Sequence, residues 1–131
     1  MSRRKRQQGQ HNVPIAFQPL KIAFTLVTVR MVRDALSIVE EVFSHNQQPM
    51  PNLELGRTTL ESLKTKLDDM LRLKDWDKET PFDYNEVQLI YAALHMYLAD
   101  LALTGNEQRI PVCMQLCKQF SAIIESIPRS R

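Results

Sequence analysis

The chain has 131 residues and a mass of 15.2 kDa, with 44% hydrophobic and 24% charged residues. This composition is typical of one globular domain, and a chain of this length needs neither a metal nor disulfides to fold. Two cysteines exclude a disulfide scaffold, and three glycines argue against a glycine-rich phosphate-binding loop. The sequence shows no signal peptide and no apolar run long enough to span a membrane, so we expect a cytoplasmic protein with no membrane partner.

Charge is distributed unevenly along the chain, although the net charge is only +2. Four basic residues fall within the first six: Arg3, Arg4, Lys5 and Arg6. Of the 17 basic residues, 11 remain between residues 7 and 128, against all 15 acidic ones, which gives this stretch a balance of −4. We therefore predict that residues 1–18 form a flexible, disordered basic arm and residues 19–131 a single, mildly acidic helical-bundle domain.

Apolar residues at three- and four-residue intervals predict the first two helices. The first helix is expected over residues 20–45, where its spacing is set by Val29, Val32, Leu36, Val39 and Phe43. Pro49 and Pro51 then interrupt the pattern. The second helix is expected to begin near Thr58, because Thr58-Thr59-Leu60-Glu61 fits a capping box, and to run toward Trp76.

The third and fourth helices complete the predicted fold. Residues 82–103 form the third, and 14 of the 17 positions from Val87 to Leu103 are apolar, which predicts a helix buried on nearly all sides. Gly105 is placed to end this helix in a left-handed conformation. The fourth helix is expected over residues 107–127, with Pro111 in its first turn. The sequence thus predicts an all-α fold, an antiparallel bundle of about four helices.

An acidic stretch between the second and third helices partly matches a calcium-binding EF-hand loop. Oxygen-bearing side chains occupy loop positions 1, 3, 5, 9 and 12: Asp75, Asp77, Glu79, Asp83 and Glu86. The sixth position requires a glycine for its sharp turn, but Thr80 stands there, followed by Pro81. We therefore favour a capping role, in which Thr80 caps the third helix and Pro81 occupies its first turn, and we predict no metal.

The remaining polar and sulfur-bearing groups do not form a recognisable catalytic set. Cys113 and Cys117 are four residues apart on an apolar stripe, and no second pair completes a zinc site, so we expect core packing. Glu41 and His45 could form half of a metal site, but no Glu-x-x-His motif accompanies them. His95 could act as a base, although a hydrogen-bonded interior or interface histidine is the commoner outcome. We predict a protein that is not an enzyme and that needs no cofactor.

Two features suggest binding functions. The first is the basic run, because each of its arginines can hold a phosphate with two hydrogen bonds. The second is the predicted third helix, because a helix that is apolar on all sides needs neighbours beyond its three partner helices. We expect this helix to contact a protein partner at Tyr91, His95 and Leu98. The favoured hypothesis is a small helical subunit of a nucleoprotein assembly that docks on protein and contacts RNA or DNA backbone through its arm. The alternative is a protein-interaction or regulatory module, in a homodimer or hetero-complex, without nucleic acid.

Overall fold

The protein is described by a computed structural model, which covers residues 20–45 and 51–127. Most of this part is helical, in the elements α2 (Leu26–His45), α3 (Pro51–Leu73), α4 (Tyr84–Thr104) and α5 (Ile110–Glu125). It also contains two short strands, β1 (Leu20–Ala23) and β2 (Glu79–Phe82), which the sequence analysis did not predict. The predicted helical character is confirmed, whereas the predicted basic arm lies outside the described residues.

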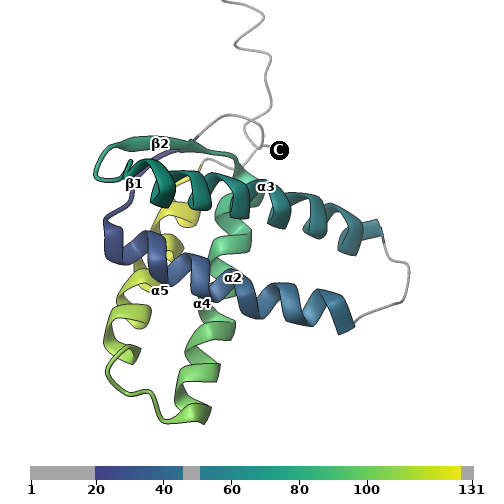
Figure 1. Cartoon of the computed structure of the whole chain (residues 1–131), viewed down its shortest axis with the longest axis vertical. Coiled ribbons are helices and arrows are strands. Elements are labelled where there is room, and N and C mark those ends of the chain that lie inside the picture. Colours follow the sequence, from purple (N-terminus) through teal and green to yellow (C-terminus); the bar gives the residue numbers. More distant parts are fainter. Residues whose placement is uncertain (1–19, 46–50, 128–131) are drawn as a thin grey trace, which may run out of the picture.

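The helices pair as two hairpins. Figure 1 shows α2 beside α3, and α4 beside α5, with the second hairpin passing across the first. Helix α4 is the central element, because it contacts α2, α3 and α5. Buried residues from all four helices join in one hydrophobic cluster.

The chain begins its described part as a strand, so the predicted helix over residues 20–45 is wrong at its N-terminal end. Strand β1 pairs antiparallel with β2, with Leu20 opposite Phe82. Just beyond β1, Phe24 stacks on Phe82 at 4.8 Å between ring centroids and meets Phe120 edge-on at 5.8 Å. Helix α2 starts only after Thr25, whose Oγ1 accepts a hydrogen bond from the amide of Thr28 at 3.1 Å. Aromatic burial and strand pairing thus replace the first helical turn.

Helix α3 begins at Pro51, earlier than the predicted start near Thr58. A proline is tolerated in the first turn of a helix because its missing N–H would have no partner there. The motif at Thr58–Glu61 therefore lies inside α3 rather than at its start. Gly56 allows α3 to approach α2 closely, since a Cβ at this position would lie 3.1 Å from Cζ of Phe43.

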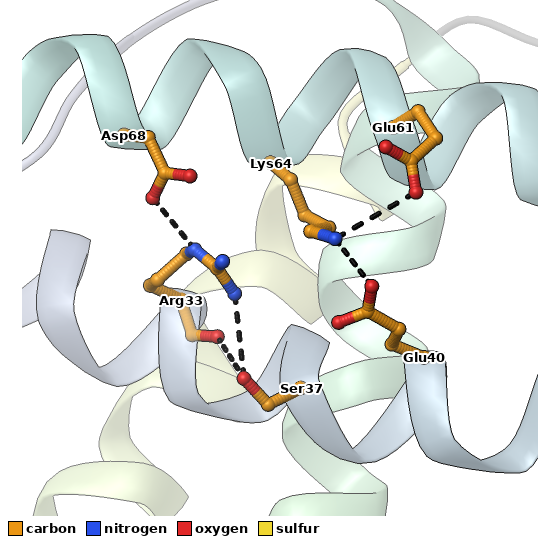
Figure 2. Close-up of polar contacts among 6 residues, drawn as sticks. All are labelled: Arg33, Ser37, Glu40, Glu61, Lys64 and Asp68. Atoms are coloured by element: carbon orange, nitrogen blue, oxygen red, sulfur yellow. Dashed lines mark hydrogen bonds and ion pairs between the residues drawn. The ribbon is translucent and has the colours of Figure 1, made fainter.

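Ion pairs join the facing sides of α2 and α3 (Figure 2). Nε of Arg33 donates to Asp68 at 2.7 Å, and Lys64 lies between Glu40 and Glu61. The hydrogen bond to Glu40 raises the pKa of the Lys64 ammonium above its ordinary value. Because these pairs are partly open to solvent, we expect them to set the hairpin's alignment more than its stability.

Helix α4 has a complete capping arrangement at its N-terminus, but not the one predicted. Thr80 and Pro81 lie in β2, and Asp83 is the N-cap. The Asp83 carboxylate accepts from the amide of Glu86 at 2.7 Å, and the Glu86 carboxylate accepts from the amide of Asp83 at 3.0 Å. At the other end Gly105 has a φ of 76°, which confirms the predicted left-handed cap.

Candidate docking surface

One face of α4 forms the centre of the hydrophobic core. Its fully buried side chains are Val87, Ile90, Ala93 and Leu94, and Tyr97 and Leu101 are nearly so. Leu94 is 0% exposed, as expected for the middle of this helix. These residues recur at the spacing of one helical face, and α2, α3 and α5 pack against α4 here.

The opposite face of α4 is exposed, so the prediction of burial on nearly all sides is wrong. We call this face the α4 stripe, defined by Gln88, Ala92, His95, Ala99 and Leu103, each of which is exposed. Leu103 is 88% exposed, and the half-buried Leu89 and Met96 flank the stripe. The three partner helices cover only one side of α4, and the stripe itself contains no charged residue.

The predicted interface residues lie at different depths around this stripe. His95 is exposed on the stripe, whereas Tyr91 and Leu98 are partly buried against the core at its edge. The rings of Tyr91 and His95 meet edge-on at 4.5 Å between centroids. Beside them, a shallow groove of about 300 Å³ separates α4 from α5 and is lined on the α5 side by Cys117, Lys118, Ser121, Ala122 and Glu125.

The two cysteines belong to the core, as the sequence predicts. Both are buried, and Sγ of Cys113 donates to the backbone carbonyl of Leu94 at 3.4 Å. Burial raises the pKa of the Cys113 thiol to about 12, and burial also raises the pKa of Cys117. Because the thiolate is the reactive form, both thiols are poor nucleophiles in the folded chain.

The pair Glu41 and His45 lies beside a second groove, of about 340 Å³, between α2 and α4. Asp100 also lines this groove, together with Ile38 and Val42. Nδ1 of His45 is 2.7 Å from the backbone carbonyl oxygen of Glu41, so this contact does not use the carboxylate. Within residues 20–45 and 51–127, no three His, Cys, Asp or Glu side chains are grouped so that they could hold a metal ion.

A buried carboxylate links α3 to the start of α4, a contact that the sequence analysis missed. Glu86 is only 3% exposed, and it accepts hydrogen bonds from Lys66 at 2.8 Å and Ser62 at 3.3 Å. Nζ of Lys66 also lies 4.5 Å from the centroid of the Phe82 ring. One usable signal for this contact is present in the sequence, namely the Asp83-x-x-Glu86 spacing of a capping box. The cluster is explained by helix capping and needs no ligand.

Just over half of the basic residues of the described part form ion pairs. Six of the 11 make ion pairs with carboxylates: Arg33, Lys64, Lys66, Arg72, Lys78 and Arg109. The predicted nucleic-acid contacts at Arg3, Arg4, Lys5 and Arg6 lie outside the described residues. The described part has 15 acidic residues against 11 basic ones, a balance that does not favour contact with a polyanion.

Helix α4 also has the length and composition of a membrane span, alone among the helices of the described part. Core helices pass the same test, and 33% of the apolar stretch of α4 is buried inside the protein. A comparison with protein-family models, with curated proteins and with solved structures gives no match. The structure defines a mainly helical protein whose central helix has an exposed, uncharged outer face.

Proposed function

We propose that the protein is a small, non-enzymatic helical docking module, which binds another protein surface through the α4 stripe. Two antiparallel hairpins would form the bundle that presents this stripe. The observation that carries the proposal is the exposure of Ala92, His95, Ala99 and Leu103 on the outer face of α4. Interaction sites use surfaces of this kind, in which uncharged and partly apolar side chains are left open by the rest of the chain.

The charges on α4 favour a protein partner over a membrane. Helices that lie on membranes usually carry Lys and Arg beside their apolar face, where these residues attract anionic lipids. Helix α4 has no Lys or Arg, and its two charged residues, Glu86 and Asp100, are both acidic. The described part as a whole has a balance of −4, which an anionic lipid surface would repel.

The docking proposal can be tested by photo-crosslinking in the cells that produce the protein. A photoreactive amino acid at Ala99, on the stripe, is expected to give a discrete protein adduct. The same group at Lys74, an exposed position just after α3, is the matched control and is expected to give none. Equal labelling from both positions, or no adduct from Ala99, would contradict the proposal.

A second candidate function is that of a subunit in a cytoplasmic nucleoprotein assembly, with Arg3, Arg4, Lys5 and Arg6 on RNA or DNA backbone. Charge segregation favours it. Six of the 11 basic residues of the described part are paired with carboxylates. The run Arg3–Arg6 has four positive charges and no acidic residue beside it in the sequence. The stripe would then hold the subunit on a protein partner while the basic run contacts phosphate.

This second function predicts a particular dependence on salt. Replacing the four basic residues by alanine should reduce the log–log slope of binding against salt by about 3, at roughly 0.7–0.9 per phosphate contact. The measurement is the affinity of the full chain and of this variant for labelled single-stranded RNA and duplex DNA. Identical slopes for the two proteins would contradict nucleic-acid binding by this run and leave the docking function unaffected.

A further inference from the structure

We infer that the surface bound by the α4 stripe belongs to a second copy of this chain, packed face to face across α4 and α5 about a twofold axis. The inference rests on the proposed docking function and names its partner. It is carried by the pattern of charge along α5, the position of the groove beside α4, and the area that the two helices expose together.

The exposed side of α5 has a charge pattern that complements itself. Lys118 and Glu125 lie on the same side of the helix with the small residues Ser121 and Ala122 between them, and all four line the groove beside α4. Seven residues separate the two charges by about 10 Å along the helix, so they do not pair with each other. Neither makes an ion pair with any other residue of the described part.

A twofold axis would bring these unpaired charges together. In a twofold interface, each copy presents the same patch in the reversed direction. With the axis at Ser121 and Ala122, Lys118 faces Glu125 of the second copy, and Glu125 faces Lys118 of the second copy. Each dimer would then contain two identical ion pairs at the edge of the contact, which fix its alignment more than its strength.

The same axis also crosses the middle of the α4 stripe. Tyr91 and His95 line the groove with the α5 residues, so the middle of the stripe lies level with Ser121 and Ala122. Around this level, Ala92 and Ala99 are small enough to let two helices approach closely. Because the stripe contains no charged side chain, its burial would leave no carboxylate or ammonium without a partner.

The area of the two helices is enough for a weak dimer, whereas that of one is not. Helices α4 and α5 have 21 and 16 residues, which correspond to lengths of about 31 and 24 Å. Side by side, with axes about 8–10 Å apart, they offer roughly 500 Å² per copy. The dimer would bury about 1,000 Å² in total, near the lower limit for a specific interface. The α4 stripe alone would offer little more than half of this area.

The test is sedimentation velocity of the purified full chain over a wide range of protein concentration. The chain is expected to be a dimer at high concentration and a monomer when diluted. Lys118→Glu would place two glutamates opposite each other at each of the two charge pairs, so the dimer is expected to dissociate about tenfold or more readily. The double variant Lys118→Glu/Glu125→Lys exchanges both charges and is expected to restore the dimer. Lys74→Glu is the control with the same charge change elsewhere, and circular dichroism checks that each variant is folded.

Each result separates this inference from the docking function. A dimer unaffected by Lys118→Glu, or one that the double variant fails to restore, overturns the proposed axis. A monomer at every concentration overturns the second copy, and the Ala99 crosslink then shows whether docking survives. An adduct with a different protein keeps the docking function, whereas an adduct within the same chain places another part of this chain on the stripe. A monomer that floats with phosphatidylglycerol vesicles would replace both proposals by a membrane contact.

Discussion

Two leucines on α4 test the assignment of its inner and outer faces with the same chemical change. Leu94 is 0% exposed and Leu103 is 88% exposed. Leu94→Ala removes three buried carbon groups, a loss of about 2.4 kcal/mol at about 0.8 kcal/mol each. The cavity left in the core adds to this, so we expect a total cost of about 3–4 kcal/mol. Leu103→Ala should change the free energy of unfolding by less than about 0.5 kcal/mol.

The assay is urea denaturation of the purified chain, followed by circular dichroism, with the melting temperature as a second reading. For a chain of this size, Leu94→Ala should lower the melting temperature by roughly 12–16 °C, at about 4 °C per kcal/mol. Both proteins are compared at a concentration low enough to keep them monomeric. Similar costs for the two substitutions would refute the division of α4 into a buried and an exposed face.

Three further predictions concern the capping, the thiol and the buried carboxylate. Asp83 is the N-cap of α4, so Asp83→Ala should lower the free energy of unfolding by about 1 kcal/mol in urea denaturation. Thr80→Ala should cost much less. A larger cost for Thr80→Ala than for Asp83→Ala would show that Thr80 is the cap after all. Burial raises the pKa of Cys113 from 9.0 to about 12, so the unfolded chain loses the thiol proton first and stability should fall as the pH rises above about 9. In Cys113→Ala the free energy of unfolding should fall less steeply as the pH is raised. The same pH dependence in the variant and the original protein would show that the Cys113 thiol does not cause the decline. Lys66→Met should lower the free energy of unfolding by about 2–3 kcal/mol, because Glu86 then keeps a buried charge without its partner. Adding Glu86→Gln should recover part of that loss. If the effects of the two substitutions simply add, the side chains of Lys66 and Glu86 are not coupled.

Local patterns were sufficient to predict the helices. The three- and four-residue spacing located α2 and α5, and Gly105 ends α4 with the expected left-handed cap. The strands could not be predicted in this way, because Leu20 pairs with Phe82 from a distant part of the sequence. That pairing also moved Thr80 and Pro81 into β2 and left the capping of α4 to Asp83.

The main error concerned α4, and it has a physical reason. Apolar residues around the whole circumference of a helix show that several sides can be buried, but not which sides the rest of the chain covers. The structure supplies that information, since Leu94 faces the core and His95, the next residue, lies on the exposed stripe. The interface predicted at His95 stays a prediction, and the structure adds only that this side chain is exposed. The charges of Lys118 and Glu125, which make no ion pair within the described residues, could be related to α4 only after the structure placed both beside the same groove.

Contact between two copies across the α4 stripe can be tested directly by the reactivity of His95 toward diethylpyrocarbonate as the protein is concentrated. His45 is also exposed but lies on α2, outside the α4–α5 face, and is the internal control. Peptide mass spectrometry gives the rate of modification of each histidine. We expect His95 to react readily in dilute solution and progressively more slowly as a second copy covers the stripe, while the rate at His45 stays constant. Unchanged reactivity of His95 over the whole concentration range would contradict a second copy on this face.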